Sequence, residues 1–290
     1  MRIDQLLVQR GLANTRSQAQ RLIADGVEWA QGETWRRVAK NGDEVPESAN
    51  VRLLDDSEAR YVSRGGLKLE AALKQVGLSV EGFACLDVGQ STGGFTDCLL
   101  QAGAKSVVGV DVGSAQLHPM LRSDPRVLCV EKVNARALTA DDLIQAYEDS
   151  MGEDGQFEAD EDEASEDDEQ AHEHNAESAE ETTSEFVPEF DLIVADLSFI
   201  SQTLVLPAVV PLLKSGGTLL TLVKPQFELQ PGQVGKGGIV KDPAFYAVVE
   251  LRLREACAAL GLTVTAWFDS PIEGGDGNRE FFICAHKPAA

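Results

Sequence analysis

The sequence predicts an α/β protein in which a small α+β unit, residues 1–60, precedes a larger unit, residues 61–290, built on a mostly parallel sheet. Two observations predict the sheet. Short apolar runs alternate with stretches of helical periodicity from residue 63 onwards, which is the pattern of parallel strands covered by helices on both faces. The last two apolar runs, 262–270 and 279–287, have only a short loop between them, so the last strand is expected to be antiparallel.

The small unit is expected to contain two helices and a small sheet. Residues 2–11 and 15–26 each place apolar residues at helical spacing and end at glycine, and strands are expected within 27–38 and 49–56. Two short helices before a small sheet recur in RNA-binding modules. The unit has nine basic and ten acidic residues, so a basic face would require segregation of charge. An ordinary solvated helix pair is the alternative.

The larger unit opens with a helix over residues 62–77, for which Ser63 is the expected N-cap. A long acidic segment interrupts the pattern of strands and helices that follows. The expected strands before and after that segment are 83–89, 106–112, 126–130, 190–196 and 217–224, in addition to the final pair.

The acidic segment is predicted to be a disordered insertion at about 148–189. It holds 19 Asp and Glu and no Lys or Arg, and such a run cannot bury apolar surface. His172 and His174 lie inside it, and solvated side chains are a better interpretation than a metal site. We therefore predict no metal.

The net charge of −23 first argues against a polyanionic partner, but 19 of the negative charges lie in this one segment, which leaves −4 for the rest. The five cysteines form no C-x-x-C pair, which indicates buried, reduced thiols and a cytoplasmic protein. The N-terminus lacks a signal peptide's apolar core, and no stretch approaches a membrane span.

A glycine-rich turn follows the first strand of the larger unit, in the sequence DVGQSTGGFTD from Asp87 to Asp97. Such turns before a helix bind phosphates, dinucleotides or S-adenosylmethionine. No lysine follows Gly94, so a triphosphate cradle is disfavoured, and the turn is not a clean G-x-G-x-x-G. A carboxylate at Asp87 would repel a pyrophosphate but could hold the ammonium of a methionine moiety.

Asp111 ends the next strand, about 20 positions beyond the turn, where an acidic residue typically binds ribose hydroxyls. That spacing alone also fits NAD. Asp87 and Asp111 together favour S-adenosylmethionine, and a turn without any ligand is the remaining alternative.

Four charged residues are placed so that strand and helix ends could bring them to one edge of the sheet. Lys68 lies on the first helix of the larger unit and Asp196 ends the fourth strand, while Lys224 ends the fifth strand and Glu280 starts the last. A lysine at the end of an apolar strand is unfavourable unless it is paired. An amine held away from water is more easily neutral and can act as a general base on a weak nucleophile such as a ribose 2′-hydroxyl.

These features resemble the TlyA family, also called the hemolysin A family, of rRNA 2′-O-methyltransferases. The matching stretches span nearly the whole chain apart from the acidic segment, and they are VSRGGLKLEAAL, DVGQSTGGFTD, VDVGSAQL, LRSDPRV, NARALT, VADLSFIS, LVKPQFE, VGKGGIV and EGGDGNREF. Gln90 departs from the family, which often has a small residue there, and the acidic segment lies outside the common pattern.

The resemblance implies a Rossmann-like, FtsJ-type methyltransferase sheet and an N-terminal RNA-binding domain like that of the fourth small-subunit ribosomal protein. It places a Lys-Asp-Lys-Glu tetrad at Lys68, Asp196, Lys224 and Glu280. RNA contacts would include Arg2 and Arg16. Cofactor contacts would fall on Asp87, Gly89, Ser91, Thr92, Gly93, Gly94, Phe95, Asp111 and Asn134.

The function expected from these residues is S-adenosylmethionine-dependent 2′-O-methylation of ribose in ribosomal RNA, free or in ribosomal subunits. Lys224 is the favoured base, Lys68 and Glu280 would position the ribose, and Asp196 would hold Lys224. A non-catalytic RNA-binding or ribosome-assembly factor and a hemolysin-like membrane-active protein are the alternatives. The target nucleotide and the oligomeric state stay open.

Overall fold

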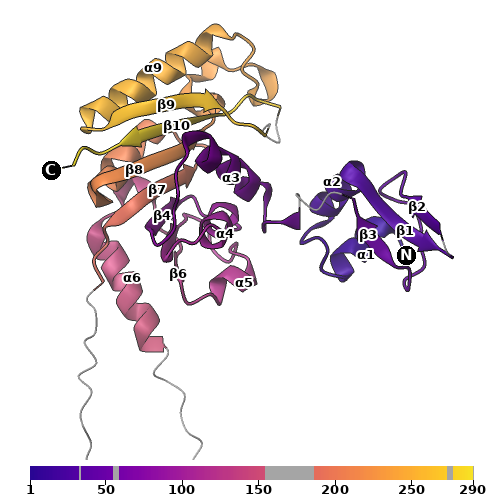
Figure 1. Cartoon of the computed structure of the whole chain (residues 1–290). Coiled ribbons are helices and arrows are strands. Elements are labelled where there is room, and N and C mark those ends of the chain that lie inside the picture. Colours follow the sequence, from indigo (N-terminus) through magenta and orange to yellow (C-terminus); the bar gives the residue numbers. More distant parts are fainter. Residues whose placement is uncertain (33, 55–58, 154–185, 273–276, 290) are drawn as a thin grey trace, which may run out of the picture.

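The computed structural model describes residues 1–32, 34–54, 59–153, 186–272 and 277–289. Figure 1 shows a small unit with a three-stranded sheet, joined to a larger unit with a seven-stranded sheet. The expected order of elements is confirmed in both.

The small unit contains both expected helices, α1 (Ile3–Gln9) and α2 (Arg16–Gly26). The Thr15 hydroxyl accepts a hydrogen bond from the Gln18 N–H and so caps α2. Apolar side chains of both helices pack against an antiparallel sheet in the order β2-β1-β3. The strands are β1 (Val27–Gln31), β2 (Thr34–Arg37) and β3 (Val51–Leu53).

The large sheet has the order β6-β5-β4-β7-β8-β10-β9. The chain moves outward from β4 to β6 and then crosses over to β7 on the other side of β4, so the strand order reverses between β4 and β7. Ligands of open α/β sheets bind outside the carboxyl ends of the strands at such a point. The strands are β4 (Ala84–Val88), β5 (Ser106–Val110), β6 (Val127–Val130), β7 (Phe190–Asp196), β8 (Leu213–Val223), β9 (Thr263–Asp269) and β10 (Phe281–His286).

The antiparallel last strand is confirmed, because β10 runs antiparallel to both of its neighbours, β8 and β9. The strands β4, β5, β6, β7 and β8 all pair in parallel with their neighbours within this group. Lys224 and Asp111 directly follow their strands, and Glu280 directly precedes β10, so these residues lie one position outside the strands that the sequence suggested.

Helices cover both faces of the large sheet. Side chains of β8 alternate between them, with Leu220 and Leu222 in one apolar cluster and Leu219 and Val223 in the other. One face carries α3 (Arg64–Val76), α4 (Gly94–Gln101) and α5 (Pro119–Arg122), and the other carries α6 (Ala140–Glu153), α7 (Leu206–Val209) and α9 (Ala244–Ala259). A short helix, α8 (Pro225–Glu228), follows β8. Four of the five free cysteines are buried, as expected, and Cys129 is half-buried.

Residues at both ends of the acidic insertion predicted at about 148–189 belong to the described part of the chain. Helix α6 continues to Glu153, and the ring of Tyr147 in this helix stacks on the ring of Phe186, with 4.7 Å between centroids. This contact gives the flanking residues an apolar anchor that the charge count does not reveal. Residues 154–185, with His172 and His174, lie outside the described residues.

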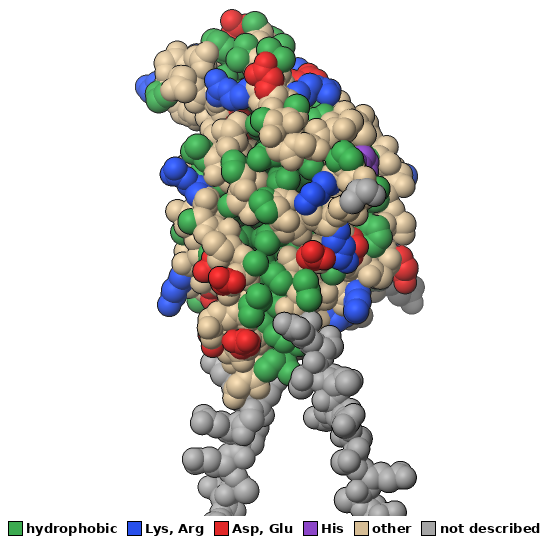
Figure 2. Space-filling view, turned by 90° about the vertical axis from the view of Figure 1, so that its left-hand side faces the viewer, with side chains coloured by type: hydrophobic (Ala, Val, Ile, Leu, Met, Phe, Trp, Pro, Cys, Tyr) green, Lys and Arg blue, Asp and Glu red, His purple; other side chains and the backbone are tan. Residues whose placement is uncertain are grey.

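Figure 2 shows the molecule from the left-hand side of Figure 1. A band of apolar side chains runs down this face, and Lys, Arg, Asp and Glu side chains are interspersed beside it. This face therefore gathers no basic patch of the kind that attracts a polyanion. Among the described residues, no helix is long and apolar enough to cross a membrane.

Candidate active site

The glycine turn after β4 is held tightly against the neighbouring strands. The N–H groups of Gly89 and Gln90 both donate to the Val110 carbonyl, at 2.8 and 3.2 Å. Gly89 has a φ of +83°, and a Cβ there would lie 2.8 Å from the backbone oxygen of Asp196. Only glycine permits this conformation and this close approach, which brings the turn against the end of β7.

The unusual Gln90 leaves this turn intact because it points away from it. Its amide lies over Gly109 of β5, where a Cβ would come within 1.9 Å of the Gln90 Nε2. The same Nε2 donates to the Thr96 hydroxyl at 2.9 Å, and that hydroxyl donates to Asp87 Oδ2 at 2.7 Å. Gly109 thus makes the room that the larger residue needs.

Asp87 lies beneath the turn and lines neither of the two cavities that open beside it. Its carboxyl is 1% exposed, and burial raises its pKa to about 7. Oδ2 accepts the Thr96 bond, while Oδ1 is buried and has no partner among the described residues. A buried carboxylate oxygen without a hydrogen-bond partner destabilises the folded state, and a cationic ligand could supply the missing partner.

Two adjoining cavities open beside the turn, of about 530 and 210 Å³, and Gly89, Ser91, Asp196 and Ser198 line both. The larger one reaches Asp111 and Asn134. The smaller one is also lined by the turn residues Gln90, Thr92, Gly94 and Phe95, and by Ser63, Gly65 and Lys224.

Two predicted cofactor residues, Gly93 and Asp87, line neither of these cavities and support the turn from below. Gly93 has a φ of +92°, and a Cβ there would lie 2.4 Å from a methyl carbon of Leu121, so packing requires a glycine at this position. Ser63 stands at the N-cap of α3, as expected, but its side chain makes no capping bond and instead borders the smaller cavity.

Asp111 and Asn134 organise the far end of the larger cavity. The Asp111 carboxylate accepts the N–H groups of Ser91 and Gly113, both at 2.7 Å. The Asn134 side-chain oxygen accepts the Arg136 N–H at 3.1 Å, and its NH₂ group has no partner among the described residues. Carboxylate oxygens with spare lone pairs and a free amide donor are suited to hydroxyl groups.

The four charged residues form two ion pairs. Lys68 Nζ lies 2.5 Å from Glu280 Oε2, and Lys224 Nζ lies 2.5 Å from Asp196 Oδ1. Strand register explains why they meet: Phe281 of β10 faces Val223 of β8, so Glu280 comes opposite Lys224. Asp196 closes β7, the other neighbour of β8.

The two ion pairs differ in their access to the cavity. Lys224 and Asp196 line the smaller cavity, and Lys224 Nζ also donates to Ser198 Oγ at 3.1 Å. Lys68 and Glu280 are buried and lie just behind, since Gly65 at the cavity wall precedes Lys68 by one helical turn. The Lys224–Asp196 pair therefore lines the smaller cavity, whereas the Lys68–Glu280 pair lies behind the residues of its wall.

Residues 61–287 match the family model described as FtsJ-like methyltransferase, and residues 1–26 match the S4 domain. The chain belongs to the FtsJ-like methyltransferase family. The 16S/23S rRNA (cytidine-2′-O)-methyltransferase TlyA of Mycobacterium tuberculosis is 38% identical, over 97% of this chain and 88% of its own length. Hemolysin A of Brachyspira hyodysenteriae is 32% identical, over 97% and 98%. A solved structure of a candidate hemolysin from Streptococcus thermophilus is 35% identical, covers 99% of this chain and 88% of its own, and has a TM-score of 0.66.

Phe199 is a feature of this FtsJ-like site that sequence reasoning missed. It follows β7, is 90% exposed, and has a φ of +64°, which is unusual for a bulky residue. Its ring lines the larger cavity and lies 5.0 Å from the ring of Phe227, just after Lys224. A phenylalanine beside an apolar strand suggests a core residue, so the sequence holds no signal of this exposure.

A buried polar network joins the loop that carries Ser198 and Phe199 to α8. Glu228 accepts the Gln202 N–H at 2.8 Å and the Ser201 hydroxyl at 2.5 Å, and Gln202 Nε2 donates to the Leu222 carbonyl at 2.7 Å. Burial raises the pKa of Glu228. The network fixes the ends of β7 and β8 relative to each other, and so fixes Asp196 relative to Lys224.

In the S4 part of the chain, the structure brings Arg2 and Arg16 together over one carboxylate. Both guanidinium groups donate to the buried Asp4, at 2.9 and 3.1 Å. The bond from Arg2 is the main reason that the pKa of Asp4 falls to about 2. Asp4 therefore stays ionised and holds two half-exposed arginines next to each other on the surface of the small unit.

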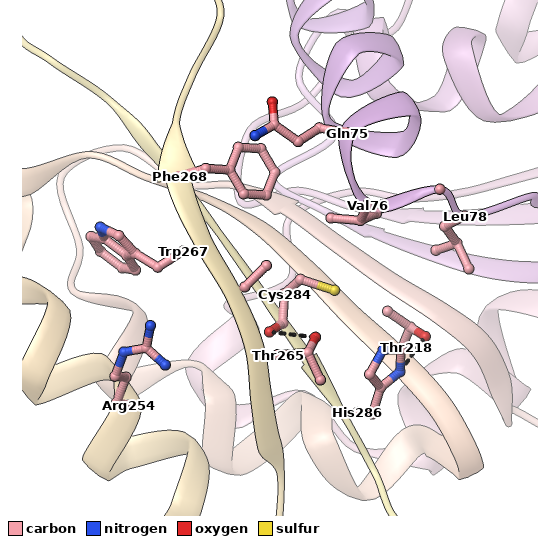
Figure 3. Close-up of a pocket in the computed structure, with 12 residues that line it drawn as sticks. Gln75, Val76, Leu78, Thr218, Arg254, Thr265, Trp267, Phe268, Cys284 and His286 are labelled. Carbon is pink, nitrogen blue, oxygen red and sulfur yellow. Dashed lines mark hydrogen bonds between the residues drawn. The ribbon is translucent and has the colours of Figure 1, made fainter.

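A further cavity of about 560 Å³ lies away from this site (Figure 3). It is lined by the end of α3 and by β9 and β10, with Phe268, Cys284 and His286 among its residues, and His286 bonds to Thr218. None of the predicted site residues lines it.

Proposed function

We propose that this protein transfers a methyl group from S-adenosylmethionine to a ribose 2′-hydroxyl of ribosomal RNA. The observation that carries the proposal is the set of two lysine–carboxylate ion pairs beside the glycine turn, of which Lys224–Asp196 lines the cavity and Lys68–Glu280 is buried. The 38% identity to the TlyA enzyme, whose name records rRNA cytidine-2′-O-methylation, supports ribosomal RNA as the substrate. Such a substrate would place the protein in the cytoplasm.

The residues of the two cavities fit S-adenosylmethionine. Asp111 and Asn134 offer an acceptor and a donor for ribose hydroxyls, and the orphaned Oδ1 of Asp87 would be satisfied by an ammonium group. Gly89, Ser91, Thr92, Gly94 and Phe95 would form the wall, and Gly93 would shape the turn. When bound, the cofactor would supply an electrophilic methyl group.

Lys224 is the group we assign to the 2′-hydroxyl, because its amine borders the cavity. After giving up one proton, its neutral amine would accept the hydroxyl proton as the oxygen becomes a nucleophile, and Asp196 and Ser198 would hold its Nζ in place. Lys68 and Glu280 would position the ribose and set the local charge from behind the wall.

The substrate would be held in two places. Phe199 offers an open aromatic face beside Lys224, on which a base turned out of its stack could lie. Arg2 and Arg16 would contact phosphates of the folded RNA from the small domain. This division of labour assigns residues 1–60 to RNA docking and residues 61–290 to methyl transfer.

A non-catalytic RNA-binding protein on the same fold is the competing proposal, and the intact tetrad argues against it. Mass spectrometry of rRNA nucleosides from cells with and without the gene separates the two. We expect one or more 2′-O-methylated nucleosides to disappear with the gene. An unchanged nucleoside profile would favour the binding protein.

A further inference from the structure

The connection between α8 and α9 contains a loop of glycine and lysine for which the mechanism has no use. We call residues 235–241, GKGGIVK, the Lys-Gly loop. Gly237 and Gly238 have φ angles of +79° and +80°, and a Cβ on either would meet nothing within 4 Å. Their left-handed backbone is therefore not imposed by packing, and it shapes an exposed surface.

The loop is fastened in this shape from below. Asn278 is a buried residue whose side chain accepts the Val240 N–H at 3.0 Å and donates to the Gly238 carbonyl at 2.9 Å. The loop is closed internally by a bond from the Gly235 N–H to the Ile239 carbonyl, at 2.8 Å. Because both the oxygen and the NH₂ group of this buried amide bond to the exposed turn, the turn is held in one conformation.

The fastening also sets the loop beside the tetrad. Asn278 precedes Glu280 by two residues, which is roughly 7 Å along an extended chain. Lys224 lies just before α8, at the start of the same connection, and Glu280 comes opposite it. The loop therefore belongs to the carboxyl edge of the sheet, where the substrate has to arrive.

The charge of the loop is available to a ligand. Lys236 and Lys241 are exposed, and neither makes an ion pair with any described residue. Several other basic side chains of the larger unit are already in ion pairs, as Arg122, Arg126 and Lys214 are. The Lys241 side chain packs over Gly235, with its Cε 3.1 Å from the position of a Cβ there, so its aliphatic part lies against the same turn that carries Lys236.

The backbone adds donors to this charge. The N–H groups of Lys236 and Gly237 donate to no acceptor in the described part of the chain. Successive free N–H groups next to a left-handed residue form a concavity that suits a phosphate oxygen. Two unpaired lysines around such a turn are suited to a phosphodiester.

We propose that the Lys-Gly loop binds a backbone phosphate of the RNA strand next to the ribose that is methylated. This inference rests on the proposed function, because it takes the ligand to be the strand that enters the cavity. It assigns the substrate two phosphate-binding regions, one in the small domain at Arg2 and Arg16 and one beside the tetrad. The second would hold the target nucleotide itself in register with Lys224.

The test compares Lys236→Ala, Lys241→Ala and the double variant with Lys105→Ala, an exposed and unpaired lysine just before β5, at the opposite edge of the sheet. The probe is ribosomal RNA from cells lacking the gene. For the double variant we expect KM and Kd for RNA to rise about tenfold and the salt slope to fall by one to two units, as for one or two lost phosphate contacts. Affinity for S-adenosylmethionine should stay within twofold, and Lys105→Ala should match the wild type.

Asn278→Ala provides a second variant that removes no charge. If its thermal midpoint shows that it folds, it should weaken RNA binding in the same direction, because the loop loses its anchor. Wild-type affinity and salt slope in the double variant would overturn the inference. A loss confined to S-adenosylmethionine affinity would overturn it as well, because the loop would then serve the cofactor.

Inorganic phosphate separates a strand-binding loop from a site for a free anion. We expect millimolar phosphate to compete no more strongly with RNA than chloride does at equal ionic strength. Saturable phosphate binding that depends on Lys236, with RNA affinity unchanged in the variants, would contradict the proposal. If the wild type methylates no RNA, the proposed function fails. If the wild type methylates RNA and the loop variants bind and methylate it equally well, only this inference fails.

Discussion

Lys68 and Glu280 are 212 residues apart in the chain, and their charged groups lie 2.5 Å apart in the interior. Helix α3 supplies one and the residue before β10 the other, so the ion pair ties the first helix of the larger domain to its last strand. Each side chain is buried, and among the described residues neither charged group has another hydrogen-bond or ion-pair partner.

Removing one partner of this pair should destabilise the fold. Glu280→Gln leaves the Lys68 ammonium buried without a counter-charge, and we expect about 3 kcal/mol of lost unfolding free energy in urea. The double variant Lys68→Met with Glu280→Leu should recover most of the loss while staying inactive. Equal stability of Glu280→Gln and wild type would show that the pair is solvated.

The buried Asp87 predicts a pH dependence of cofactor affinity. Its folded pKa of about 7 lies above its ordinary value of 3.8, so the carboxyl is largely neutral below pH 7 and ionised above it. Only the ionised form attracts an ammonium group, so affinity for S-adenosylmethionine should rise from pH 6 to pH 7.5. Calorimetry on Asp87→Asn, in which this rise should vanish, is the control.

The same shift predicts how the stability of the cofactor-free protein changes with pH. Between pH 4 and 7 the folded state binds a proton at Asp87 that the unfolded state has released, so this residue makes stability fall as pH rises. Asp87→Asn should flatten that fall in thermal melts. Parallel profiles of the two proteins would place the carboxyl in contact with water.

Phe199 should matter for RNA and not for the fold. Because the ring is exposed and its φ is +64°, Phe199→Ala should keep the wild-type thermal midpoint, and Phe199→Gly should raise it slightly. If a base stacks on the ring, Phe199→Ala should remove about 1–3 kcal/mol of stacking free energy and lower kcat/KM for RNA accordingly. Phe199→Tyr should restore kcat/KM. Met120→Ala, an exposed apolar change on α5, is the matched control.

Deletion of residues 154–185 should leave a folded, active enzyme. The Tyr147–Phe186 stack and α6 lie outside the deletion, and they join β7 at its first residue, roughly 20 Å along the strand from Asp196. We expect an unchanged thermal midpoint and unchanged RNA affinity. Loss of folding would show a structural role, and a large rise in RNA affinity that disappears at high salt would show an electrostatic brake.

The sequence predicts the fold well because strand and helix periodicities are local. The alternation of buried strands with helices, the turn after β4 and the positions of Lys68, Asp196, Lys224 and Glu280 at element ends can all be read from residue order. Pairing within the tetrad cannot, because it depends on the register that sets Phe281 against Val223.

Exposure is the other property that residue order hides. Asp87 was expected to contact the cofactor from the turn, and it lies beneath the turn in a bond to Thr96. Phe199 was not among the predicted site residues, and it is the most exposed large apolar residue among those described. Both depend on packing between distant segments, which periodicity does not encode.

Lys224 can be tested most directly by incubating purified protein with S-adenosylmethionine and rRNA from cells lacking the gene, and analysing the nucleosides by mass spectrometry. The wild type should form a 2′-O-methylated nucleoside, and Lys224→Ala should form none while binding the cofactor within several-fold of wild type. Lys214→Ala is the matched control, because Lys214 pairs with Asp191 on the same two strands at their opposite ends, and it should stay active. Near-normal turnover by Lys224→Ala, or a methyl group on a base instead of a ribose, would contradict the proposed mechanism.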